Sequence, residues 1–226
     1  HEPYWSFGAW FWDYDNDGAL DLFVAAYSTG IGHIAAHHLG VQVKDSKHEL
    51  MRLWKGDGKG GFVDVAKDVG LTYPALPMGA NFGDLDNDGW LDFYLGTGDP
   101  DYTTLIPNRM FRNAEGRFFQ DVTTAGGFGH LQKGHAVAFA DLDNDGDQDV
   151  YIVMGGALTG DNYRNALFLN PGTTNHWLKL KLEGTRCNRA AIGTRIKVSL
   201  TTPKGPRDIY KTVNSGGSFG CLIYSR

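Results

Sequence analysis

Three short stretches of alternating aspartates are the residues of this chain whose types and spacing could bind a metal. They begin at Asp13 (DYDNDG), at Asp84 (DLDNDG) and at Asp141 (DLDNDG). Each has Asp at positions 1, 3 and 5, Gly at position 6 and another Asp at position 9. Carboxylates that alternate around a tight Gly turn point toward one centre, which suits a hard cation with oxygen ligands. The spacing therefore predicts a cation site in each stretch.

The predicted ligands of each site are four carboxylates and the backbone carbonyl at position 7. They are Asp13, Asp15, Asp17, Ala19 and Asp21; Asp84, Asp86, Asp88, Trp90 and Asp92; and Asp141, Asp143, Asp145, Asp147 and Asp149. We expect about three Ca²⁺ ions, because Mg²⁺ demands a stricter octahedron and retains its waters. The stretches contain no Cys or His, which argues against zinc and copper.

Two other interpretations of these stretches are weaker. An EF-hand needs Glu at position 12 and flanking helices, whereas position 12 is Val24, Leu95 or Ile152. The residues that follow each stretch are rich in β-branched and aromatic side chains and predict strands. A metal-free turn is the other alternative, since Asp, Asn and Gly are common in turns. Three copies of one spacing, with carboxylates close enough to repel one another, favour cation sites.

The elements that must hold these loops are predicted to be short β-strands. A strand is expected before each loop at 6–12, 78–83 and 134–140, and hairpins at 53–71 and 110–128, with a degenerate copy at 167–180. Together with the strand after each loop, this gives about four strands in a period of roughly 60 residues. That pattern is typical of a β-propeller blade with a cation bound between its first two strands.

On these residues the chain resembles the FG-GAP/VCBS repeats of the integrin α-subunit propeller, which carry calcium loops between blade strands. The most similar stretches are "GANFGDLDNDGWLDFYLG" and "GHAVAFADLDNDGDQDVYIV". Residues 175–200 resemble the start of the ASPIC/UnbV domain, which follows FG-GAP repeats in the cartilage acidic protein family. The residues that carry this second resemblance are Asn175, His176, Trp177, Asn188, Arg189, Ile192 and Gly193.

The two resemblances imply an all-β protein in two parts. Residues 1–174 are expected to form about three four-stranded blades of a larger propeller. Residues 175–226 are expected to form a small, incomplete β module. The resemblances also imply a secreted or cell-surface location. The exposed edges of an incomplete propeller are expected to invite self-association.

The leading functional hypothesis is an extracellular scaffold that binds a protein or glycan partner in adhesion, with Ca²⁺ in a structural role. One alternative is a structural subunit of an extracellular assembly or filament. Another is a carbohydrate-binding or polysaccharide-acting protein, in which aromatic side chains stack on sugars instead of packing between blades; the candidates are Trp10, Trp12, Tyr14 and Trp90. The sequence contains no nucleophile elbow, zinc-protease motif or phosphate loop, so no enzymatic activity is expected.

Charge and hydropathy narrow the choice of partners. The formal net charge of −5 offers no basic surface for nucleic acid. The sequence has no apolar run long enough for a transmembrane helix. With nucleic acid and a membrane span not expected, the partners that the two resemblances imply are extracellular proteins or glycans.

Two features outside the loops also carry candidate chemistry. The insertion at 28–50 is expected to be partly helical and places His33 and His37 four residues apart. That spacing can hold Zn²⁺ or Cu²⁺, and the alternative is a plain surface helix. Cys187 and Cys221 can either pair in a disulfide or remain two thiols.

Overall fold

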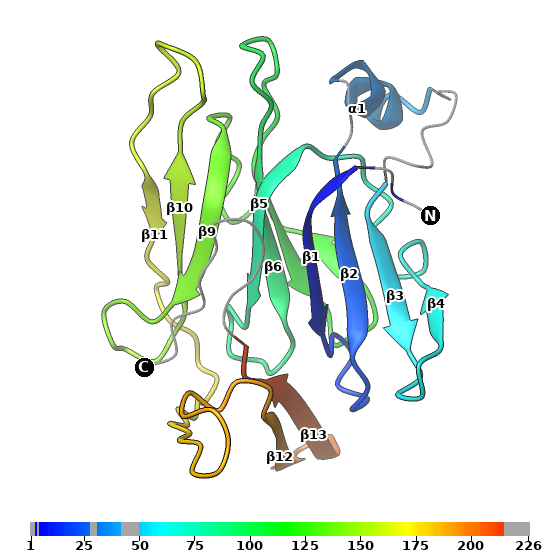
Figure 1. Cartoon of the computed structure of the whole chain (residues 1–226), viewed down its shortest axis with the longest axis vertical. Coiled ribbons are helices and arrows are strands. Elements are labelled where there is room, and N and C mark those ends of the chain that lie inside the picture. The colour runs from blue at the N-terminus through cyan, green and yellow to red at the C-terminus, as the bar shows by residue number, and fades with distance from the viewer. Residues whose placement is uncertain (1–2, 4, 28–30, 42–49, 215–226) are drawn as a thin grey trace.

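The computed structural model describes residues 3, 5–27, 31–41 and 50–214. Within them it contains four antiparallel sheets and a single α-helix (Figure 1). The expected all-β fold class is therefore confirmed. Three of the sheets pack in succession along the chain, and the fourth is a two-stranded hairpin at one end of them.

The first and second sheets each have four strands in the order of the chain. The first sheet contains β1 (Ser6–Trp12), β2 (Asp21–Ala26), β3 (Arg52–Gly56) and β4 (Phe62–Asp64). The second sheet contains β5 (Pro77–Gly83), β6 (Asp92–Thr97), β7 (Arg109–Asn113) and β8 (Phe119–Asp121). The predicted strands before the first two loops and the predicted hairpins after them are confirmed.

The third sheet has three strands among the described residues, so the expectation of a four-stranded third unit is wrong there. It contains β9 (Gly134–Ala140), β10 (Asp149–Met154) and β11 (Ala166–Phe168). After β11 the chain reaches Pro171, which has no N–H to donate to a partner strand. Asn175 then donates to the carbonyl oxygen of Asp86 at 2.9 Å. The segment after β11 therefore runs past the second acidic loop instead of forming a hairpin.

The hydrophobic core lies between neighbouring sheets. Trp12 of the first sheet stacks on Phe119 of the second, with ring centroids 5.7 Å apart. A separate cluster, which includes Tyr94 and Phe139, fills the space between the second and third sheets. Trp10 and Trp12 are only 6% and 2% exposed. The packing interpretation is therefore correct for both tryptophans, and sugar stacking is wrong for them.

The remaining elements lie at opposite ends of the sheets (Figure 1). The helix α1 (Ile31–His38) lies in the insertion, as expected for a partly helical segment. The C-terminal hairpin consists of β12 (Arg195–Thr202) and β13 (Gly205–Thr212). Within the described residues the sheets do not close into a ring. No helix in that part of the chain is long and apolar enough to cross a membrane.

Candidate metal centres

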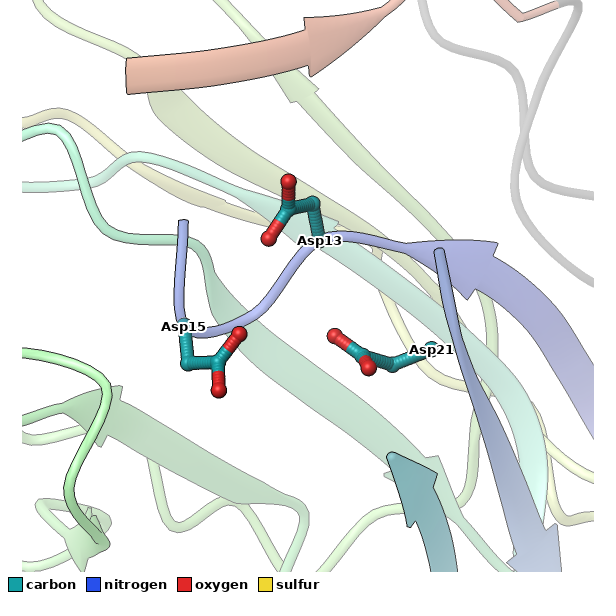
Figure 2. A group of neighbouring side chains, drawn as sticks. All are labelled: Asp13, Asp15 and Asp21. Atoms are coloured by element: carbon teal, nitrogen blue, oxygen red, sulfur yellow. The ribbon is translucent and has the colours of Figure 1, made fainter. Parts of the chain in front are cut away.

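The three acidic loops lie at the same end of their sheets, because each joins the first two strands of its sheet. Figure 2 shows the first loop, in which Asp13 and Asp15 follow β1 and Asp21 is the first residue of β2. In every loop, carboxylate oxygens of three residues lie within 4.8 Å of one another. The groups are Asp13, Asp15 and Asp21; Asp84, Asp86 and Asp88; and Asp141, Asp143 and Asp145. Three aspartate clusters that could hold a metal ion therefore stand where the spacing predicts them.

The backbone conformation of the loop explains which residue types stand at two of its positions. Asn at position 4 has a positive φ of 52° at Asn16, 53° at Asn87 and 64° at Asn144, a region that Asn tolerates better than most residues. Gly at position 6 has a φ of 88° at Gly18 and 92° at Gly89, where a larger residue would be strained. The Asn-Asp-Gly sequence therefore shapes the turn that brings the carboxylates together.

The Asp at position 9 has a structural role that its spacing did not indicate. Each of its two oxygens accepts a hydrogen bond from a backbone N–H, one at position 2 of the same loop and one at the end of the third strand or, in the third sheet, two residues beyond it. The donors are Tyr14 and Gly56 to Asp21, Leu85 and Asn113 to Asp92, and Leu142 and Asn170 to Asp149, at 2.8–3.1 Å. This carboxylate therefore fastens the start of each loop to a strand far away in the sequence.

One carboxylate oxygen in each loop is buried and has no hydrogen-bond donor among the described residues. These atoms are Oδ1 of Asp15, Oδ1 of Asp86 and Oδ1 of Asp141. A buried polar atom without a partner costs free energy, and carboxylate oxygens are the ligands that hard cations prefer. The residues present therefore fit a hard divalent cation in each loop.

Burial makes several of these carboxylates costly to ionise in the absence of a cation. The pKa of Asp21 is raised to about 7 and the pKa of Asp13 to about 6, chiefly by burial, and the negative charges of neighbouring aspartates contribute to both shifts. In the second loop, burial raises the pKa of Asp88 to about 6. A divalent cation would offset this negative charge, so the same crowding favours cation binding.

Basic side chains also reach the first two loops, and they come from the same position of the repeat. Lys55 on β3 forms ion pairs with Asp15 and with Asp17, the latter at 2.9 Å. Arg112 stands at the matching position of β7 and pairs with the aspartates at positions 3 and 5 of the second loop, at 2.6 and 3.2 Å. Each of these loops therefore has a positive charge of its own that a metal ion must compete with.

The third loop lacks this basic residue. The matching position after β11 is Leu169, which is 59% exposed. Lys179, from the segment that follows, pairs instead with Asp141 at 3.2 Å. The three loops therefore share their acidic residues but differ in the source of positive charge.

Replacing Lys55 by Met is expected to strengthen divalent cation binding at the first loop, on the order of tenfold, because a competing charge is removed. The same change is expected to lower the melting temperature in excess chelator, since Asp15 and Asp17 lose their counter-charge. Isothermal titration calorimetry and thermal melting measure the two effects. Lys59→Met, at an exposed lysine in the β3–β4 turn, is the matched control. Equal behaviour of the two variants would contradict the assignment.

Neighbouring loops are joined by the Asn at position 4. Asn16 Nδ2 donates to the carbonyl oxygen of Gly89 at 3.1 Å, and Asn87 Nδ2 donates to the carbonyl oxygen of Gly146 at 3.3 Å. Position 4 of each loop thus contacts position 6 of the next loop along the row. Each of these hydrogen bonds therefore helps to hold two neighbouring loops in their conformations.

The C-terminal hairpin contacts the first two loops from outside. The N–H of Tyr210 donates to Asn16 Oδ1 at 2.8 Å, and Arg207 donates to the carbonyl oxygen of Asp88 at 2.6 Å. The Arg207 guanidinium also lies over the Trp90 ring, 5.5 Å from its centroid. Trp90 is therefore partly covered by the hairpin, a contact that no local sequence signal indicated.

The position-7 carbonyls of Ala19, Trp90 and Asp147 remain predicted ligands. The N–H of each of these residues donates to the Asp at position 5 of its loop, at 2.7–3.0 Å. These bonds hold the turn together, and they involve the N–H groups of these residues and not their carbonyl oxygens. The position-9 residues Asp92 and Asp149 also stay predicted ligands, beyond the backbone bonds described above.

The two candidate sites outside the loops are untested. The side chain of His33 and the whole of Cys221 lie outside the described residues, so neither a His33–His37 metal site nor a disulfide with the exposed Cys187 can be assessed. The His37 ring packs edge-on against Tyr73, with centroids 5.8 Å apart. Both sites stay predictions.

Comparison with known proteins matches the part of the chain that contains the first two loops. A family model described as FG-GAP-like repeat matches residues 13–95. This segment runs from the start of the first acidic loop into β6, directly after the second loop. FG-GAP repeats are found in extracellular domains of the adhesion type. No curated protein matches the chain.

Proposed function

We propose that this protein is a calcium-binding β-scaffold in which a Ca²⁺ ion clamps the loop end of each of three neighbouring sheets. The observation that carries the proposal is the buried carboxylate oxygen without a partner in every loop, on Asp15, Asp86 and Asp141. Ligand sets made only of oxygen favour Ca²⁺ over zinc or copper. The FG-GAP-like match over residues 13–95 adds independent support.

The residues of the first loop illustrate how the chain would hold the ion. Asp13, Asp15 and Asp21 would contribute carboxylate oxygens, and the bound ion would neutralise their crowded charge. Asp21 also holds the N–H groups of Tyr14 and Gly56, so it ties the loop to β3. A cation at this point would therefore rigidify the junction of β1, β2 and β3.

We further propose that each sheet is a blade of the propeller type and that the protein acts outside the cell or on its surface. In this role the metal is structural, the surfaces of the blades bind a protein or glycan partner in adhesion, and the chain has no catalytic task. The VCBS-type and ASPIC/UnbV-type assignments belong to the same proposal. The FG-GAP-like match supports it through the extracellular domains in which such repeats occur.

Counting the bound ions tests the proposal. Equilibrium dialysis of the chelator-treated protein against Ca²⁺ is expected to give about three ions per chain. Asp15→Asn, Asp86→Asn and Asp141→Asn are each expected to remove or weaken one ion, because each replaces a buried carboxylate with a neutral amide. Asp68→Asn, at an exposed aspartate outside the loops, is the matched control and is expected to leave the count unchanged.

Two outcomes would overturn the metal assignment. One is the absence of Ca²⁺ binding at millimolar Ca²⁺. The other is binding that the three loop variants and the control variant change equally, which would mean that the ions bind elsewhere. Among the alternative functions, a role in assembly is favoured by exposed apolar side chains on the outer sheets, such as Phe11 on the first and Leu167 on the third. The carbohydrate-binding alternative is weakened because Trp10 and Trp12 are buried.

A further inference from the structure

The two interfaces between neighbouring sheets are built from the same positions of the repeat. Each sheet has a forward face, which meets the following sheet, and a back face, which meets the preceding one. The forward face of the first sheet includes Phe23 and Leu53, which pair across β2 and β3 and are fully buried. In the second sheet the paired residues at the matching positions are Tyr94 and Met110, also fully buried.

The same forward positions are exposed in the third sheet. They are occupied by Tyr151 and Leu167, which pair across β10 and β11, and by Val153 two residues further along β10. Their exposed fractions are 36%, 47% and 37%, respectively. The third sheet therefore presents an apolar forward face that matches two buried ones, and no further sheet covers it among the described residues.

The first sheet presents an apolar back face at the opposite end of the row. In the second sheet the back face is buried and consists of Phe82, Phe93, Leu95, Phe111 and Phe119. The matching residues of the first sheet are Phe11, Leu22, Val24, Trp54 and Phe62. Phe11 and Phe62 are 54% and 46% exposed, and the other three are partly exposed. Every position keeps its apolar character, but no sheet formed by the described residues covers it.

The third acidic loop, like the third sheet, has an exposed residue at a position that contacts a neighbour in the first two repeats. Asn16 and Asn87 each donate to the next loop, whereas Asn144, at the same position of the third loop, is exposed. The third sheet thus exposes an apolar face and a polar side chain. In the first and second sheets, the residues at the same positions contact the sheet that follows. The matching carbonyl oxygen on the first sheet belongs to Gly18, and it already accepts a hydrogen bond from Arg195 of the C-terminal hairpin, so the apolar faces carry the inference.

We propose that two copies of this chain associate head to tail, with the forward face of the third sheet of one copy against the back face of the first sheet of the other. The occupant is a second copy because this chain carries both halves of an interface that it already forms twice internally. Two copies contribute six sheets in all, within the range of about four to eight blades found in propellers. Exposed apolar patches of this kind mark interaction sites. The proposal does not depend on metal binding.

Sedimentation velocity of the full chain from micromolar to about 100 µM concentration tests this contact. The wild-type chain is expected to associate reversibly as its concentration rises. Phe11→Asp on the back face and Leu167→Asp on the forward face are each expected to weaken association at least about tenfold, because a charge is placed within the apolar contact. Leu105→Asp, at a residue that is 61% exposed in a loop away from both faces, is the control and is expected to associate like wild type.

A mixture of the two variants separates head-to-tail contact from other modes. Each variant keeps one intact face, so an equimolar mixture is expected to form a one-to-one complex while each variant alone stays monomeric. If either variant fails to fold, as judged by thermal melting, Phe62→Asp or Tyr151→Asp replaces it on the same face. A wild-type chain that stays monomeric, variants that associate as strongly as wild type, or a mixture that forms no complex would overturn the proposal.

Discussion

Saturating Ca²⁺ is expected to raise the free energy of unfolding by about 2.7 kcal/mol for each occupied loop when free Ca²⁺ is about a hundredfold above its dissociation constant. If the unfolded chain does not bind the ion, three loops give about 8 kcal/mol. For a chain of this length, the melting temperature is then expected to rise by about 15 to 30 °C. The physical reason is that the ion neutralises carboxylates held together only in the folded state.

Differential scanning calorimetry in excess chelator and in millimolar Ca²⁺ measures this shift. Mg²⁺ at the same concentration is the matched control and is expected to give a smaller shift, because it retains its waters in such sites. A triple variant that combines Asp15→Asn, Asp86→Asn and Asp141→Asn is expected to lose most of the Ca²⁺ effect. Equal melting of the wild-type chain with Ca²⁺ and with chelator would contradict the structural role of the ion.

Asp92→Ala is expected to be among the most destabilising single substitutions, even in chelator. Asp92 is 1% exposed and accepts the N–H groups of Leu85 at 2.9 Å and Asn113 at 2.8 Å. Its removal leaves two buried donors unpaired, at about 1 to 3 kcal/mol each. Burial raises the pKa of Asp92 well above its ordinary value, so keeping this carboxylate ionised in the folded state costs free energy. Replacing Asp92 by Ala removes that cost, which offsets part of the loss. Urea denaturation of both proteins in chelator measures the net effect.

An exposed aspartate with the same number of bonds serves as the control for this prediction. Asp57 accepts the N–H groups of Lys59 at 2.7 Å and Gly61 at 2.8 Å in the β3–β4 turn, where water can replace it. Asp57→Ala is therefore expected to cost about 1 kcal/mol or less. Asp92→Asn keeps one acceptor oxygen and is expected to fall between the two. Similar losses for Asp57→Ala and Asp92→Ala would mean that the buried carboxylate does not fasten the loop.

The acidic loops and the strands around them could be predicted because their signals are local. Asn at position 4 and Gly at position 6 adopt left-handed backbone angles that few other residues tolerate. The alternating aspartates between them must then converge on one centre. The flanking apolar and β-branched residues identify strands before and after each turn. Sequence reasoning therefore located the three clusters and the strand order of the first two sheets.

The third sheet shows where this reasoning was incomplete. The stretch from 167 keeps the pattern of a hairpin start, but Thr173 and Asn175 donate to the carbonyl oxygen of Asp86 in the second loop instead. Whether a short apolar stretch pairs as a hairpin or crosses to another loop depends on which partners lie nearby. Local pattern alone does not contain that information.

The sequence by itself determined the repeating unit, which is an acidic turn between two strands that occurs three times with the same spacing of aspartates. Only the tertiary structure decided how these units support one another. Asp21 and Asp92 hold N–H groups of the third strand of their sheets. Lys55 and Arg112 reach the loops from β3 and β7, and Asn16 bonds to Gly89, 73 residues away. These contacts join residues that are distant in the chain. Their partners are set by the packing of sheet against sheet, and spacing within one repeat cannot specify them.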